Sequence, residues 1–127
     1  MPAPYADTWK GMMATKTKFK LLVVDIDGTL IGISKTVSAQ NREAVERAIR
    51  ANIAVSISTG RSLKSSLNIL NQLVLDSYHI FFDGAFAGPL DFSEEIFVSP
   101  IPPDIVKQMV EFSREHGINT ALPEATS

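Results

Sequence analysis

The chain has 127 residues, the size of one ordinary domain, and its 45% hydrophobic and 20% charged content is typical of a globular protein. A formal net charge of −2 argues against a nucleic-acid-binding protein, which should carry a basic face, and the lack of cysteine excludes disulfides and thiolate metal sites. No apolar run approaches the roughly 18 residues of a membrane span. We therefore expect neither nucleic acid nor a membrane as a partner, and the composition is compatible with a cytoplasmic protein.

The first half of the chain predicts a strand followed by a helix. Residues 1–18 lack the apolar stretch of a signal peptide, and we expect them to form a flexible N-terminal tail. The apolar run 19–24 does not alternate, which is typical of a parallel strand covered on both faces. Ser38 is a suitable N-cap for a helix over 39–51.

The alternation then continues along the chain. Residues 53–58 predict a second strand, residues 62–74 a second helix with Val74 on its apolar face, and residues 79–82 a third strand. A β-α-β-α-β order implies right-handed crossovers and a parallel sheet.

After residue 84 the pattern changes. Short apolar segments at 85–87 and 95–99 flank Gly88-Pro89, which suggests a hairpin. Pro103-Asp104 predicts the start of a third helix, and Gly117 fits just beyond its end.

Two carboxylates end the first strand, in the sequence Asp25-Ile26-Asp27-Gly28-Thr29. Ligands of open α/β sheets bind at this end of the strands, and the Gly28 turn allows Asp27 to leave the strand and lean over the site. One carboxylate can then attack phosphorus while the other moves a proton. Mg²⁺ suits this pair because it is a hard cation that prefers oxygen ligands.

The second strand ends in Ser58-Thr59-Gly60-Arg61, immediately before a helix. A hydroxyl and free main-chain N–H groups there can bind a phosphate without adding negative charge. Arg61 is open to two interpretations: it binds an anionic substrate, or it is an exposed arginine at a helix start.

These two motifs resemble motifs I and II of the haloacid dehalogenase-like hydrolase superfamily. The Thr-Gly-Arg form, with Asp83-Gly84-Ala85 after the third strand, resembles the Cof-type phosphatase branch over residues 19–125. The resemblance implies a three-layer Rossmann-like α/β core, and Mg²⁺-dependent hydrolysis of small phosphorylated metabolites through an aspartyl-phosphate.

The resemblance also implies roles for individual residues. Asp25 matches the nucleophile and a metal ligand, and Asp27 matches the general acid/base and, through its main-chain carbonyl, a second metal ligand. Thr59 and the Gly60 amide match the phosphate-binding position. Asp83, with Gly84, is a candidate substrate contact, although the branch usually has Asn-Gly there and an aspartate cannot donate as an amide does.

Residues 19–84 would then form the N-terminal half of the core, and residues 85–127 the hairpin and the start of a truncated cap domain. The motif III lysine and motif IV acidic pair of the family do not follow, so we expect an incomplete chain that is weakly active or inactive alone. In this family the first strand is central, so its apolar edge would be exposed here and would allow self-association.

Several alternatives stay open. The chain could be a non-catalytic truncated product, or a module that binds Mg²⁺ or phosphate without turnover. It could also be a phosphomutase, which uses the same first carboxylate pair as a phosphatase. A signalling receiver domain fits less well because its phosphoacceptor lies on a later strand, where Asp83 is the candidate. We expect His79, which precedes a buried strand, to have a structural role.

Overall fold

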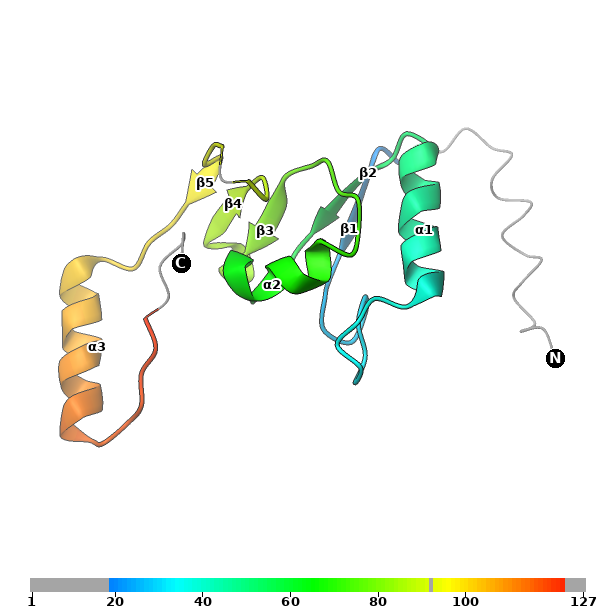
Figure 1. The fold of residues 1–127 in the computed structure, drawn as a ribbon. Helices are drawn as coiled ribbons and strands as arrows, with labels where there is room; N and C mark the ends of the chain where they lie inside the picture. Colours follow the sequence, from blue (N-terminus) through cyan, green and yellow to red (C-terminus); the bar gives the residue numbers. More distant parts are fainter. Residues whose placement is uncertain (1–18, 92, 123–127) are drawn as a thin grey trace.

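The computed structural model describes residues 19–91 and 93–122 (Figure 1). The tail expected at residues 1–18 lies outside the described residues. The elements, in chain order, are β1 (Leu21–Val24), α1 (Ala39–Arg50), β2 (Ala54–Ile57), α2 (Leu63–Leu70), β3 (His79–Phe81), the 3-10 turn η2 (Phe82–Gly84), β4 (Phe86–Gly88), β5 (Phe97–Val98) and α3 (Pro103–Glu115). The predicted order of strands and helices, including the hairpin, is confirmed.

The strands β1 and β2 pair in parallel, with Leu21 opposite Ala54. A parallel bridge between Ser58 and Ile80 joins the end of β2 to β3. The strands β3, β4 and β5 pair antiparallel in that order. The order β1-β2-β3 brings the carboxyl ends of three parallel strands to one edge, as an α/β core requires.

Both core helices begin within one residue of the predicted start, α1 at Ala39 and α2 at Leu63. The Ser38 hydroxyl accepts a hydrogen bond from the Asn41 N–H at 3.1 Å, and Ser62 caps α2 in the same way. These caps satisfy N–H groups that have no partner within a helix.

The helix α2 ends at Leu70, four residues before the predicted end. Gln72 and Leu73 donate main-chain hydrogen bonds three residues back, to Ile69 and Leu70, so a tight turn replaces the helix. Leu73 still reaches the core from this turn, whereas Val74 is 81% exposed. The predicted place of Val74 on an apolar helix face was wrong, because its spacing continued past the real end of the helix.

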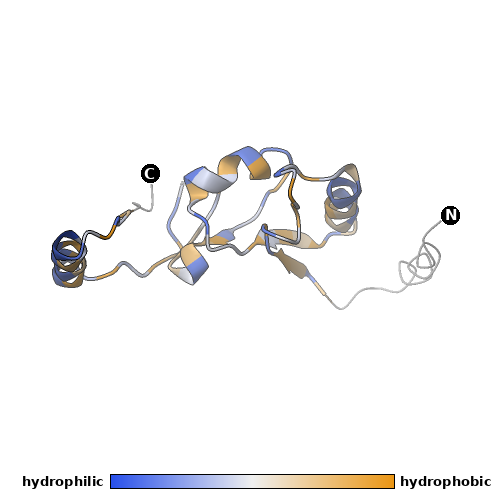
Figure 2. Ribbon diagram, turned by 90° about the horizontal axis from the view of Figure 1, so that it is seen from below, coloured by the Kyte–Doolittle hydropathy of each residue, from blue (hydrophilic) through white to orange (hydrophobic). Residues whose placement is uncertain are grey.

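Figure 2 shows α1 and α2 on the same side of the strands. Both crossovers advance in one direction along the sheet, and right-handed crossovers then place their helices on one face. The buried core lies between this helix layer and the strands, and its largest members are Ile26, Ile57, Leu63, Leu70, Phe81 and Phe86.

The first strand is poorly covered within the described residues. Leu21, Leu22 and Val23 are 53%, 42% and 48% exposed, although Val24 packs against the core. Coverage on both faces, expected from the apolar run, is therefore not present here. The exposed apolar strand expected for a chain without the neighbouring strand is present.

The helix α3 stands apart from the core, at the end of an extended segment that follows β5 (Figure 1). None of its described residues is buried. The division of the chain into a core half and the start of a cap at residue 84 stays a prediction.

Candidate active site

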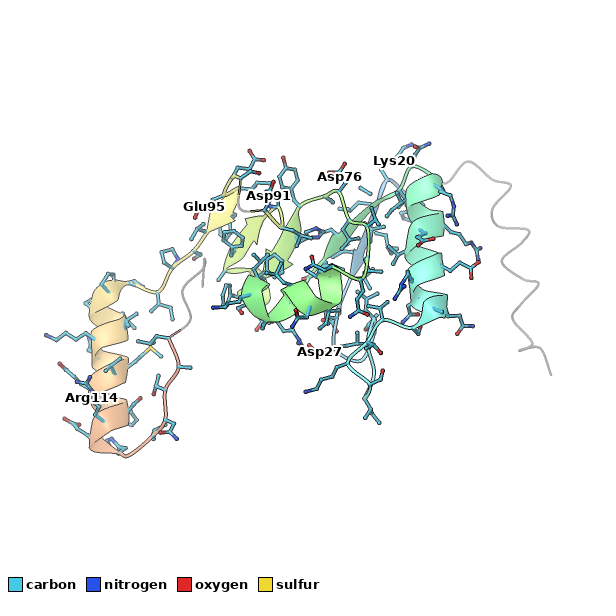
Figure 3. The ribbon with its side chains drawn as sticks, viewed as in Figure 1. Lys20, Asp27, Asp76, Asp91, Glu95 and Arg114 are labelled. Carbon is cyan, nitrogen blue, oxygen red and sulfur yellow. The ribbon has the colours of Figure 1, made fainter. Side chains whose placement is uncertain are left out.

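The loop after β1 folds around one buried residue. The carbonyl of Ile26 accepts hydrogen bonds from the N–H groups of Leu30 at 3.0 Å and Ile31 at 3.1 Å. Gly28 adopts a φ of +81°, which favours glycine, and donates to the Ile31 carbonyl at 2.9 Å. Asp27 thus leaves the strand direction, as the Gly28 turn predicts, and its side chain projects from the end of β1 at the edge of the sheet (Figure 3).

Asn41 in the first turn of α1 anchors this loop. Its side-chain amide donates to the carbonyls of Thr29 at 3.2 Å and Leu30 at 3.0 Å. The role of Asn41 was not predicted, because an asparagine in the first turn of a helix has no distinctive sequence signal.

The loop after β2 presents donors suited to an anion. Thr59 is 4% exposed, and its hydroxyl oxygen accepts the Arg61 N–H at 3.2 Å, which leaves the hydroxyl proton available. Within residues 19–91 and 93–122, nothing accepts a hydrogen bond from the Gly60 N–H. A free amide beside a hydroxyl is an arrangement that binds phosphate.

The loop after β3 is fastened to the loop after β2. Phe82 N–H donates to the Arg61 carbonyl at 3.1 Å, and Asp83 N–H donates to the Thr59 carbonyl at 3.2 Å. A Cβ built on Gly60 would lie 2.8 Å from an Asp83 carboxylate oxygen. The candidate substrate contact Asp83 therefore lies directly against the candidate phosphate loop, and Gly84, at φ +99°, follows it.

Arg61 forms a two-point ion pair with Asp27. Its Nε donates to Oδ2 and its Nη2 to Oδ1, both at 2.6 Å, across 34 residues of sequence. The side chains are 28% and 56% exposed. Neither interpretation of Arg61 from the sequence included this partner, because the pairing of side chains on neighbouring strand ends has no local signal.

The ion pair changes the electrostatics of Asp27. The hydrogen bonds from Arg61 hold the pKa of the Asp27 carboxyl below its ordinary value and outweigh the opposing effect of desolvation. The charges of Arg61 and Lys35 lower the pKa further. The same bonds raise the pKa of Arg61. Asp27 is thus held as an anion, which opposes its action as a proton donor.

The oxygen ligands at these strand ends are of the type that Mg²⁺ prefers, but they are too few to complete its coordination. The carboxylate of Asp25 is exposed, and the Asp27 carbonyl is the expected second oxygen. Among the residues that the structure describes, no group of three or more His, Cys, Asp or Glu side chains could hold a metal ion. Mg²⁺ is commonly bound by one or two carboxylates together with substrate phosphate and water, so these residues provide part of such a site.

His79 has the structural role expected of it. The imidazole is fully buried, and its Nδ1 accepts the Ile57 N–H at 3.1 Å across the β2–β3 pairing. Desolvation lowers the pKa of His79 to about 4, so the ring is neutral near pH 7.

The described part of the chain contains no helix of the length and apolar character that crossing a bilayer requires.

Comparison with protein families gives one match that covers most of the chain. A family model described as haloacid dehalogenase-like hydrolase matches residues 22–126. The chain is 34% identical over 110 residues to the 5-amino-6-(5-phospho-D-ribitylamino)uracil phosphatase YitU of Bacillus subtilis, which is 86% of this chain and 41% of that protein. It is 43% identical over 54 residues to the phosphatase YwtE of the same organism, with the same substrate in its name, covering 42% of this chain and 19% of that protein.

Solved structures give the same result. A haloacid dehalogenase-like hydrolase from Bacteroides thetaiotaomicron superposes with a TM-score of 0.71 at 25% identity, over 79% of this chain and 39% of that chain. The subclass IIB sugar phosphatase BT4131 superposes with a TM-score of 0.61 at 31% identity, over 77% of this chain and 38% of that chain. This chain spans about two fifths of the length of YitU and of both structures.

Proposed function

This chain belongs to the haloacid dehalogenase-like hydrolases, and from that membership we propose that its strand ends form part of a phosphatase site for small phosphorylated metabolites in the cytoplasm. The observation that carries the proposal is the placement of two motifs on adjacent parallel strands. Asp25 and Asp27 follow β1, and Thr59 and Gly60 follow β2. The residues proposed as nucleophile and phosphate-binding group thus follow neighbouring parallel strands, at the edge of the sheet where ligands of such sheets bind.

The proposed reaction uses the residues of this edge in two steps. A carboxylate oxygen of Asp25 attacks the phosphorus of a phosphate monoester, and the bond from phosphorus to the ester oxygen breaks as Asp27 gives that oxygen a proton. Water then attacks the aspartyl-phosphate and releases phosphate, with Asp27 taking the water proton. The Thr59 hydroxyl and the Gly60 N–H hold the phosphoryl oxygens.

Mg²⁺ is the cofactor that the family and the donor set favour. The Asp25 carboxylate and the Asp27 carbonyl would hold it. When bound, it would offset the repulsion between an anionic nucleophile and an anionic phosphate.

The names of relatives favour a sugar or polyol phosphate as the substrate. Two relatives are named as phosphatases of a phosphorylated ribityl compound, and one structure is of a sugar phosphatase. The Asp83 carboxylate beside Gly60 offers an acceptor for a substrate hydroxyl, and Arg61 offers a donor to a phosphate oxygen.

The nucleophile is tested by trapping a phosphoryl mimic. We expect beryllofluoride with Mg²⁺ to give a protein-bound ¹⁹F NMR signal with this chain, and we expect Asp25→Asn to abolish it. Ser58→Ala, which changes a hydroxyl on the same edge without removing a proposed ligand, is the control. A bound signal that persists in Asp25→Asn would contradict the assigned nucleophile.

Turnover by the 127-residue chain is expected to be very weak or absent. The described residues lack a group of three metal-binding side chains, and the Asp27 carboxylate is held by Arg61. Hydrolysis of p-nitrophenyl phosphate with and without Mg²⁺ measures this. Rapid Mg²⁺-dependent hydrolysis that Asp25→Asn abolishes would show that the chain is a competent enzyme by itself.

A binding module without turnover is the second candidate function. The two hydrogen bonds from Arg61 to Asp27 favour it, since they hold this carboxylate as an anion and so oppose proton donation to a leaving group. It predicts phosphate binding by the chain without a trapped beryllofluoride adduct. A phosphomutase uses the same carboxylate pair and would be recognised by transfer of the phosphoryl group to a second sugar hydroxyl instead of water.

A further inference from the structure

The Asp27–Arg61 ion pair engages the carboxylate that the proposed reaction uses as its acid and base. Both Asp27 oxygens accept from the guanidinium, each at 2.6 Å. The guanidinium thus occupies one acceptor position on each oxygen and competes with any proton exchange between Asp27 and a leaving group. Release of Asp27 from Arg61 would remove this competition.

The main chain of Arg61 is held by two hydrogen bonds, whereas, within the described residues, its side chain makes only one long hydrogen bond besides those to Asp27. The Arg61 N–H donates to the Thr59 hydroxyl at 3.2 Å, and its carbonyl accepts from Phe82 at 3.1 Å. The guanidinium otherwise donates to the Ser65 carbonyl at 3.4 Å, a long hydrogen bond. The side chain can therefore change partner while the loop that carries Thr59 and Gly60 stays in place.

A phosphate group is a suitable competing partner. Arginine binds phosphate through two parallel hydrogen bonds, as it binds a carboxylate, and a phosphate dianion carries more charge and more acceptor oxygens. The Asp27 side chain is 56% exposed, and exposed ion pairs are weak because water screens them. The donors expected to receive the phosphate, at Thr59 and Gly60, directly precede Arg61 in the same loop.

We propose that Arg61 is a two-position arm, which holds Asp27 while the site is empty and turns to the phosphate group of an arriving substrate, so that substrate binding itself releases Asp27. The inference rests on the proposed function, because it requires phosphate to bind at the Thr59–Gly60 loop. Arg61 would then contact the substrate phosphate itself, and Asp27 would be free of Arg61 only while a phosphate is bound.

The movement of the arm is tested on the unchanged chain. The side-chain Nε–H of Arg61, followed by ¹⁵N NMR, should shift when inorganic phosphate is added and should not shift with sodium chloride at equal ionic strength. An Nε–H signal that phosphate leaves unmoved overturns the proposal, and this readout needs no variant that folds.

A double-mutant cycle on phosphate affinity then measures the competition. Asp27→Asn should tighten the dissociation constant of inorganic phosphate by about threefold more when Arg61 is present than in an Arg61→Gln background, a factor of the size that an exposed ion pair gives. The matched control is Arg50→Gln, which removes an arginine that faces Glu46 at 3.6 Å on α1 and should leave phosphate affinity unchanged.

The outcomes separate the arm from the proposed function. Equal effects of Asp27→Asn in both backgrounds overturn the arm, while phosphate binding by the unchanged chain would still support the phosphate site. Absence of phosphate binding in every protein refutes the phosphate site and the arm together.

Discussion

The imidazole of His79 lies in the β2–β3 pairing, where its Nδ1 takes the Ile57 N–H that a main-chain carbonyl would ordinarily accept. Its pKa in the folded chain is about 4, against an ordinary value of 6.5. Between these two pH values the unfolded chain binds a proton that the folded chain does not. The contribution of the neutral, buried His79 to the free energy of unfolding is therefore complete above about pH 6.5. It is lost as the pH falls toward 4.

We expect the free energy of unfolding to fall by about 3 kcal/mol at most over this range, since each pKa unit corresponds to about 1.4 kcal/mol. In His79→Gln, whose side-chain oxygen can also accept the Ile57 N–H, this part of the pH dependence should be lost. Urea unfolding at pH 7, 6, 5 and 4 measures it. His116→Gln, at an exposed histidine that follows α3, is the control, and a slope in His79→Gln equal to that of the unchanged chain would contradict the expectation.

Gly60 is needed because of its neighbour Asp83. A Cβ at this position would lie 2.8 Å from a carboxylate oxygen, and the end of a side chain can move aside at modest cost. We expect Gly60→Ala to lower the free energy of unfolding by about 1 kcal/mol. In an Asp83→Ala background the loss should vanish, and urea unfolding of the four proteins measures this. An undiminished loss in that background would mean that another contact requires the glycine.

At the residue scale, the sequence predicted which residue types gather but not how they pair. The carboxylates, the Gly28 turn and the cap at Ser38 depend on local chemistry, and the sequence showed them. The cap at Ser62 was not predicted, because the helix was expected to begin at that residue. The Asp27–Arg61 pair depends on two rotamers at the ends of different strands, which no local pattern specifies.

In the hairpin, the main chain at Gly88 passes close to the main chain at Glu94 and to the ring of Phe86. A Cβ on Gly88 of β4 would lie 2.9 Å from the main-chain oxygen of Glu94 and 3.0 Å from the ring of the buried Phe86. Neither neighbour can move easily, so we expect Gly88→Ala to lower the free energy of unfolding by about 1 to 3 kcal/mol.

Thermal and urea unfolding check this expectation against a matched variant. Gly32→Ala places the same methyl group where nothing lies within 4 Å, and it should be close to neutral. Equal losses in the two variants would show that the approach to Glu94 and Phe86 is not the cause.

At the element scale, strands and helices were predictable because their apolar spacing and caps are local. The end of α2 was not, since the apolar spacing continued to Val74 after the helix had given way to a turn at Gln72 and Leu73. Likewise, Phe82 looked like a strand residue but has a φ of +51°. Its main-chain N–H donates to the Arg61 carbonyl, and tertiary contacts of this kind have no sequence signal.

At the scale of the whole molecule, the apolar strand β1 is largely exposed within the described residues. Val23 is 48% exposed, and β1 pairs with β2 on one side only among the described residues. An exposed apolar strand at a sheet edge is a template for association, so we propose that the chain self-associates through β1.

Val23→Lys should shift the chain toward monomer in sedimentation velocity, because a charged edge residue opposes pairing between chains. The monomer's fold should be retained, since the side chain is half exposed. Val74→Lys, at an 81% exposed position after α2, is the matched control and should leave association unchanged. Identical behaviour of the two variants would place the association surface elsewhere.

At this scale the parallel α/β core followed from the alternation of elements, and the family comparisons agree with it. The position of α3 could not be predicted from the sequence. An amphipathic pattern shows that a helix has an apolar face, but it does not show which surface covers that face.

The loops after β2 and β3 are tied together by the hydrogen bonds of Phe82 and Asp83, two successive residues whose left-handed φ of 51° and 53° is costly for residues other than glycine. Neither loop can therefore change alone. In a library of variants scored for folding, positions 59–61 and 82–84 should compensate one another, and a glycine at 82 or 83 should rescue losses that other single changes in the partner loop cause.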